Sequence, residues 1–209
     1  MRLLLAGATG LVGGHVLALA LADPRVKAIA APVRRELATH PKLLAPVVDF
    51  DALPEVARWW RADAAICALG TTIAKAGSQE AFRRVDHGHV LAVARAARAH
   101  GTPAFVLNSA ASASAASRIF YSRVKGEAER DIEALHFGSL TIVRPGLIGG
   151  ERSESRPGET VAKLVLGALG PVLPRALRIN PPERIAGAML EAAIAGRPGR
   201  HTVGAAELN

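Results

Sequence analysis

The stretch Leu3–Gly13, LLLAGATGLVG, places three glycines at every third position between a short apolar run and a longer amphipathic segment. In a strand–turn–helix unit, the first glycine permits a tight turn and the second lets the backbone approach a pyrophosphate, while the third allows close packing of helix on strand. The start of the helix adds free N–H groups for the phosphates. A plain tight turn would also explain the glycines, but their position between strand and helix favours a dinucleotide site. The expected cofactor-binding residues here are Gly7, Thr9, Gly10, Leu11, Val12 and Gly13.

The rest of the chain alternates between short apolar runs and helical patterns. The expected strands are Arg2–Ala6, Val26–Val33, Pro46–Val48, Ala64–Ala68, Ala104–Leu107, Leu140–Arg144 and His201–Val203. The expected helices are Gly10–Ala22, Leu53–Trp60, Ser78–His100, Tyr121–Leu135, Thr160–Leu169 and Pro182–Ala195. Continuous apolar strands suit a sheet buried on both faces, and β–α alternation implies parallel strands. We therefore predict an α/β fold with a doubly wound, Rossmann-type parallel sheet. It would form a single domain over residues 1–209, with a small C-terminal substrate-covering segment at 146–174.

The charge of the chain is positive but dispersed. Its 209 residues contain 26 Lys and Arg against 18 Asp and Glu, which gives a formal net charge of +8. No basic run or nucleic-acid-binding motif accompanies this charge, so we expect no nucleic-acid partner. The single cysteine, Cys67, excludes a disulfide framework, and seven histidines with one cysteine make a zinc site improbable, so we predict no metal.

The segment Leu3–Ala22 contains no charged residue and follows Arg2, so it also looks like a secretory signal. Its glycines would weaken a membrane helix, and a strand, phosphate turn and helix are the more specific interpretation. No later segment reaches the roughly 18 apolar residues that a membrane span needs. We therefore expect a cytoplasmic protein with no membrane partner.

The end of the second expected strand selects the cofactor. An acidic residue about 20 positions after the glycine turn would accept the ribose 2′-hydroxyl of NAD. Arg34 and Arg35 stand there instead, and two guanidinium groups can clamp a 2′-phosphate. NADP(H) is therefore favoured over NAD(H), although the two arginines also fit the scattered arginine usage of the chain. After the third expected strand, Asp49 and Phe50 could bracket the adenine; Asp49 could equally be a solvated loop residue.

Tyr121 and Lys125 lie four positions apart on an expected helix, so their side chains share one face. A nearby ammonium would favour the phenolate form of a tyrosine and so help it exchange protons. The chain has one tyrosine and five lysines, which makes this spacing by chance uncommon. Ser109 follows the Ala104–Leu107 strand, at the edge where parallel sheets bind ligands, and could donate a hydrogen bond to a substrate carbonyl. Asn108 is a weaker candidate for the same role.

These features together resemble an atypical short-chain dehydrogenase/reductase, and more narrowly its Tat-interacting-protein oxidoreductase branch with its small bacterial relatives. The segments that carry the resemblance are Ala68–Thr72, Lys75–Gly77, Phe82–Asp86, Tyr121–Glu127, Arg144–Gly146 and Glu154–Glu159. The resemblance implies an NADP(H)-binding Rossmann domain in which Tyr121 is the acid/base, Lys125 holds the nicotinamide ribose and Ser109 orients the substrate oxygen. It also implies further cofactor contacts from Leu69, Gly70, Thr71, Thr72, Arg144, Pro145 and Gly146.

Two departures limit what the resemblance implies. Many relatives carry an asparagine on the central helix for a proton relay, and the nearest position here holds Asp86. Larger eukaryotic members carry an extra N-terminal segment, so their regulatory partners do not transfer to this chain. We therefore expect an NADP(H)-dependent oxidoreductase acting on a small carbonyl or alcohol, as a monomer or homodimer. A non-catalytic NADP(H) sensor or scaffold and a nucleotide-sugar-type epimerase or dehydratase are the alternatives.

Overall fold

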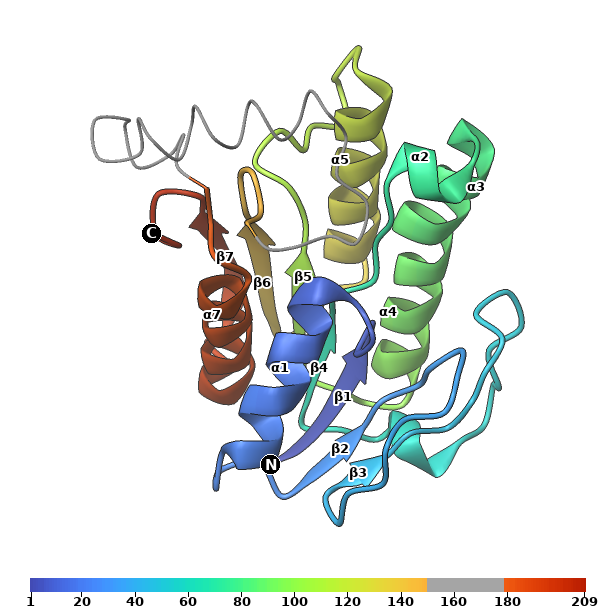
Figure 1. The fold of residues 1–209 in the computed structure, drawn as a ribbon, viewed down its shortest axis with the longest axis vertical. Coiled ribbons are helices and arrows are strands. Elements are labelled where there is room, and N and C mark those ends of the chain that lie inside the picture. The colour runs from blue at the N-terminus through green and yellow to red at the C-terminus, as the bar shows by residue number, and fades with distance from the viewer. Residues whose placement is uncertain (150–178) are drawn as a thin grey trace.

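The sheet and the helices around it appear in the computed structural model, which describes residues 1–149 and 179–209 (Figure 1). All strand pairings are parallel, in the order β3-β2-β1-β4-β5-β6-β7. The strands are β1 Arg2–Ala6, β2 Ala28–Ala30, β3 Leu43–Leu44, β4 Ala64–Cys67, β5 Ala104–Asn108, β6 Ser139–Arg144 and β7 Gly199–Gly204. The direction of strand order reverses between β1 and β4, and the carboxyl ends of these neighbouring strands are where such a sheet binds ligands. The predicted doubly wound parallel sheet is confirmed.

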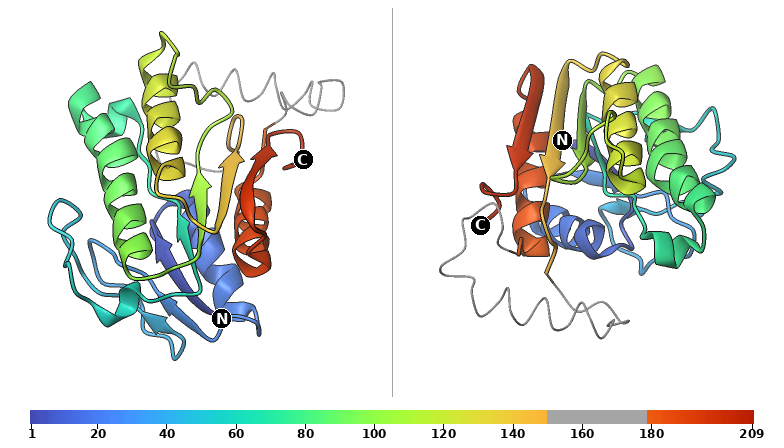
Figure 2. Two further views of the ribbon diagram at one scale, coloured as in Figure 1. Left: turned by 180° about the vertical axis from the view of Figure 1, so that it is seen from behind. Right: turned by 90° about the horizontal axis from the view of Figure 1, so that it is seen from above.

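Both faces of the sheet are covered, as the continuous apolar strands predict. Leu3 and Leu5 of β1 belong to the core on one face, together with residues of α1 (Leu11–Ala22) and α7 (Pro182–Ala195). Leu4 of β1 belongs to the core on the other face, under α4 (Val90–Ala99) and α5 (Phe120–Glu133). Figure 2 shows the sheet between these two pairs of helices. Alternate β1 side chains thus enter opposite cores.

The long helix predicted over Ser78–His100 is present, but it consists of three parts. Ser78 caps α3 (Gln79–Arg83), its hydroxyl oxygen accepting a hydrogen bond from the Ala81 N–H at 3.0 Å. A π-helical turn, η2 (Arg84–His89), follows and leads directly into α4. Such turns insert an extra residue into a helix and are frequent at functional sites. Here the turn carries Asp86, which is buried.

Two local predictions need correction, and one short helix was not predicted. The third strand is β3 rather than Pro46–Val48, where only Val47 forms an isolated bridge with Val33; Pro46 has no N–H to donate to a sheet ladder. The predicted helix Leu53–Trp60 is only the short 3-10 helix η1 (Arg58–Trp60). The short helix α2 (Ile73–Ala76) was not predicted. The predicted helix Thr160–Leu169 and most of the predicted substrate-covering segment lie outside the described residues.

Candidate active site

The glycine turn joins β1 to α1 in a form that excludes side chains at two glycines. Gly7 has a φ of +90°, and a Cβ added to it would lie 2.6 Å from the carbonyl carbon of Ala68. A Cβ on Gly13 would lie 2.0 Å from the carbonyl oxygen of Gly7. Gly10 begins α1 without a side-chain cap, and the first turn of the helix holds no acidic residue. The first N–H groups of α1 are therefore left for an anionic ligand.

The side chains around this turn differ in their exposure, and so in what they could contribute to a bound ligand. Thr9 and Gly10 are exposed, whereas Val12 is buried in the core and Leu11 is half-buried. Val12 would therefore contribute its backbone, and not its side chain, to a bound pyrophosphate. The backbone geometry of the turn is the part that fits a dinucleotide.

The two arginines expected at the 2′-phosphate follow the Val33 bridge. Arg34 and Arg35 are both exposed and pair with no carboxylate in the described part of the chain. Asp49 is also exposed, with one carboxylate oxygen accepting from the N–H of Asp51 at 2.9 Å. Phe50 differs from the expectation, because its ring is buried in the core 5.8 Å from the ring of His89. Of the predicted adenine pair, only Asp49 is exposed.

A buried ion pair lies beside the carboxyl end of β4. The ammonium nitrogen of Lys125 is 2.8 Å from a carboxylate oxygen of Asp86, and their side chains are 8% and 0% exposed. The other oxygen of Asp86 accepts a hydrogen bond from the N–H of Thr71 at 2.8 Å. A Cβ on Gly70 would lie 3.3 Å from Asp86 and 3.6 Å from Lys125. The loop after β4, the π-helical turn and α5 therefore meet at this pair.

Lys125 keeps its charge in this setting. Burial acts to lower its pKa, but the neighbouring carboxylate of Asp86 opposes this effect, and on balance the pKa of Lys125 is raised above its ordinary value. Tyr121 is half-buried one helical turn earlier, with its ring 5.5 Å from that of the buried Phe82. The predicted Tyr–Lys face of α5 is thus present, and a fixed carboxylate adjoins it.

A second buried carboxylate lies one turn further along the same face. Glu129 accepts a short hydrogen bond from the hydroxyl of Ser109 at the end of β5. Arg144 of β6 binds the same carboxylate with two donors, one of them Nε at 3.0 Å. This bond raises the pKa of Arg144. The structure therefore brings Ser109 and Arg144 together around a residue that was not predicted. The available signal was spacing, because Glu129 follows Tyr121 by eight positions and Lys125 by four.

Ser109 and Asn108 differ in the hydrogen-bonding groups that remain free for a ligand. A serine has one O–H proton, and that of Ser109 is directed to Glu129, which leaves its oxygen lone pairs. The side-chain oxygen of Asn108 is buried and has no hydrogen-bond partner among the described residues. Such an unpaired buried group is uncommon and marks a place where a ligand can add a donor.

The remaining predicted contacts are held in short turns. The carbonyl oxygen of Pro145 accepts from the N–H of Ala111 at 2.8 Å, and Gly146 donates its N–H to the side chain of the buried Asn180 at 2.7 Å. Leu69 is half-buried, and Thr72 caps α2 by accepting from the N–H of Lys75 at 3.2 Å. These turns are therefore fixed by hydrogen bonds on both sides of the candidate site.

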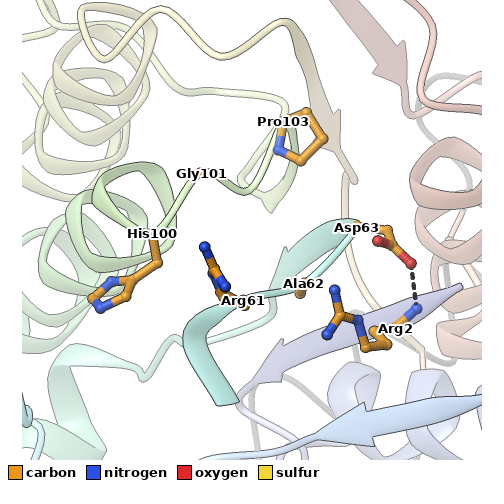
Figure 3. Close-up of a pocket in the computed structure, with 7 residues that line it drawn as sticks. All are labelled: Arg2, Arg61, Ala62, Asp63, His100, Gly101 and Pro103. Atoms are coloured by element: carbon orange, nitrogen blue, oxygen red, sulfur yellow. Dashed lines mark hydrogen bonds between the residues drawn. The ribbon is translucent and has the colours of Figure 1, made fainter. Parts of the chain in front are cut away.

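A separate hollow of about 310 Å³ lies at the opposite end of the strands from the candidate site (Figure 3). Its lining includes Arg2 at the start of β1, Asp63 before β4 and Pro103 before β5. These residues stand at the amino ends of the strands. The carboxylate of Asp63 accepts from the backbone N–H of Arg2 at 2.6 Å, so it has a structural partner. The residues predicted from the motifs lie at the carboxyl ends instead.

Comparison with known proteins finds relatives that match most of the chain, and no family model matches it. The chain is 40% identical over 181 residues to the mitochondrial protein fmp52 of Emericella nidulans, covering 80% of this chain and 76% of that protein. It is 35% identical over 176 residues to the mitochondrial protein FMP52 of Candida albicans, covering 79% and 75%. It is 44% identical over 124 residues to the protein HTATIP2 of Rattus norvegicus, covering 59% of this chain and 51% of that protein.

Solved structures share the fold at lower sequence identity. MoeE5 in complex with UDP-glucose and NAD superposes with a TM-score of 0.73 at 17% identity, covering 98% of this chain and 76% of that one. The oxidoreductase ylbE from Lactococcus lactis gives a TM-score of 0.59 at 22% identity, covering 73% and 72%. These similarities support the Rossmann-type architecture.

The comparisons correct the expected cytoplasmic localisation, which is wrong. The relatives from Emericella nidulans, Aspergillus clavatus and Candida albicans are named as mitochondrial proteins. The prediction rested on rejecting a secretory signal, and that rejection cannot distinguish the cytosol from an organelle. Within residues 1–149 and 179–209, no helix is long and apolar enough to cross a membrane.

Proposed function

The chain belongs to the family of the fmp52 and HTATIP2 proteins, atypical short-chain dehydrogenases/reductases with a Rossmann-type fold, and on that premise we propose that it is an NADP(H)-dependent oxidoreductase acting on a small carbonyl or alcohol. The observation that carries this proposal is the Tyr121–Lys125 face of α5, with Lys125 charged and buried beside the carboxyl end of β4. The glycine turn supports it, because its backbone leaves room and free N–H groups for a pyrophosphate.

The residues present fit the proposed cofactor. The first turn of α1 would hold the pyrophosphate, and Arg34 with Arg35 would hold the 2′-phosphate. Asp49 would contact the adenine and Lys125 the ribose on the nicotinamide side. When bound, NADP(H) supplies or accepts a hydride. Leu69–Thr72 and Arg144–Gly146 would line its two sides.

The protein side of the reaction is proton transfer. Tyr121 would give a proton from its phenol oxygen to a carbonyl oxygen, or take one from an alcohol. Lys125 would favour the phenolate by its charge. Because the O–H of Ser109 is directed to Glu129, Ser109 would accept a hydrogen bond from an alcohol unless it turns away from that carboxylate. The unpaired oxygen of Asn108 offers a further acceptor.

A second candidate function is a non-catalytic NADP(H) sensor or scaffold. Two groups of the proposed catalytic set already have carboxylate partners, Lys125 with Asp86 and Ser109 with Glu129. A site with its groups engaged in this way could bind the cofactor without turnover. Activity measurements separate the two candidates.

Cofactor titration tests the binding part of the proposal. We expect NADPH to bind more tightly than NADH. We expect the double substitution Arg34→Ala with Arg35→Ala to reduce the difference between these two affinities. The control is Arg95→Ala with Arg98→Ala, which removes two positive charges from the exposed face of α4. Equal affinities for NADPH and NADH in the wild type would refute the assignment to NADP(H).

Turnover tests the catalytic part. NADPH consumption would be followed with a panel of small aldehydes and ketones. Tyr121→Phe keeps the ring beside Phe82, so we expect cofactor binding to persist while turnover of any accepted compound is lost. Unchanged turnover in this variant would remove Tyr121 from the mechanism. Cofactor binding with no turnover across the panel would favour the sensor.

A further inference from the structure

The Asp86–Lys125 pair makes the local charge at the carboxyl end of β4 close to zero. The raised pKa of Lys125 keeps it an ammonium, and Asp86 faces it as a carboxylate at 2.8 Å. Two other titratable groups, Tyr121 and Cys67, lie close enough to influence the pKa of Lys125. Burial raises the pKa of the Cys67 thiol to about 12, so this group is neutral. Asp86 is therefore the fixed negative charge that balances Lys125.

Asp86 is held so that it cannot follow Lys125 or turn to solvent. Its side chain is fully buried on the π-helical turn, and its second oxygen accepts from the N–H of Thr71 in the loop after β4. Gly70 covers the pair so closely that an added Cβ would lie 3.3 Å from Asp86. The carboxylate is thus anchored independently of the ammonium, and its charge stays in place whichever cofactor form is present.

We propose that Asp86 sets the preference of the site for the oxidised over the reduced cofactor. The inference rests on the proposed function, because it assumes that NADP(H) binds with its nicotinamide ribose at Lys125. The oxidised nicotinamide ring carries a positive charge and the reduced ring carries none. An uncompensated ammonium would therefore repel only the oxidised form. By cancelling that ammonium, Asp86 lets NADP⁺ bind in a pocket that the Lys125 charge would otherwise bias towards NADPH.

This role differs from that of a proton relay, since it requires no proton to move. Asp86 acts on the cofactor through Lys125, and so is a positioning and specificity-determining residue rather than a catalytic one. The readout is the ratio of two dissociation constants, Kd for NADP⁺ divided by Kd for NADPH. Loss of packing alone weakens both forms together and leaves this ratio unchanged.

The test compares Asp86→Asn with the wild type by calorimetric titration of NADP⁺ and of NADPH. The asparagine keeps the shape and the oxygen that accepts from Thr71, but it removes the charge. We expect the ratio to rise about tenfold, the effect of one partly screened unit charge nearby, and to rise less at high salt. The matched control is Asp131→Asn. Asp131 is also a carboxylate, and it lies 2.8 Å from His87, which belongs to the same π-helical turn as Asp86. Loss of the Asp131 charge should leave the ratio unchanged.

Lys125→Met should change the ratio of the two dissociation constants in the opposite direction. It leaves the Asp86 carboxylate unbalanced, so the ratio should fall below the wild-type value, and it decides the matter if Asp86→Asn does not fold. A ratio that is unchanged in both folded variants would overturn the inference. The proposed function would still stand in that case, provided that the wild type binds NADP(H). Binding of neither cofactor form by the folded wild type would overturn the proposed function, and the inference with it.

Discussion

Removing Arg144 should destabilise the protein more than removing Glu129, although both changes break the same ion pair. The Glu129 side chain is 5% exposed and that of Arg144 is 30% exposed. Arg144→Met leaves a buried carboxylate whose one remaining donor among the described residues is the hydroxyl of Ser109, and stranding such a charge costs about 3–5 kcal/mol. Glu129→Gln leaves a guanidinium that can turn to water, so the loss should be about 1–2 kcal/mol.

The measurement is urea unfolding followed by the fluorescence of Trp59 and Trp60. The double variant with methionine at both positions should be more stable than Arg144→Met alone, because no buried charge is left unpaired. The stranded carboxyl of Arg144→Met binds a proton more readily in the folded than in the unfolded chain. Its destabilisation should therefore shrink as the pH falls from neutrality. An Arg144→Met variant no less stable than Glu129→Gln would refute this account of the pair.

Two further predictions concern the core. Gly126→Ala would place a Cβ 2.1 Å from the N of Ala115, so we expect a loss of stability of about 3 kcal/mol. A Cβ on Gly187 would meet no described atom within 4 Å, so Gly187→Ala should be neutral or stabilise α7 by about 0.5–1 kcal/mol, and thermal unfolding of the two variants checks the contrast. Cys67 is fully buried and its pKa is raised to about 12, so a thiol reagent at neutral pH should modify it only when the chain unfolds, and rapid labelling of the native protein would contradict its burial.

The fold could be predicted because its signals are local. The apolar run before Gly7 and the glycine spacing fix the first strand, turn and helix, and similar runs mark the later strands. The errors occur where short-range chemistry competes with the pattern. At Pro46 a missing N–H shifts the third strand, and α2 depends on a cap from Thr72 and on Gly77 with a φ of +83° at its end.

The site could be predicted only in part, for a different reason. Tyr121 and Lys125 are neighbours on one helix, so their spacing reveals their common face. Asp86 and Glu129 acquire their roles from partners on other elements, which no local spacing records. In the sequence, Asp86 stands out only as a departure from relatives. Its contacts with Lys125 and Thr71 require the π-helical turn, which has no recognised sequence signature here.

The pairing of α1 with α7 has a consequence for synthesis of the chain. The core on that face joins Val16 of α1 to Ile185 and Met189 of α7, and the two helices lie side by side in Figure 1. On the ribosome, α1 therefore emerges long before the helix that covers it. Its apolar face must remain uncovered, or be shielded by a chaperone, until residues beyond Pro182 leave the exit tunnel. Truncation before α7 should thus yield an aggregation-prone chain, even though the glycine turn and the Tyr121–Lys125 face lie entirely within the part already made.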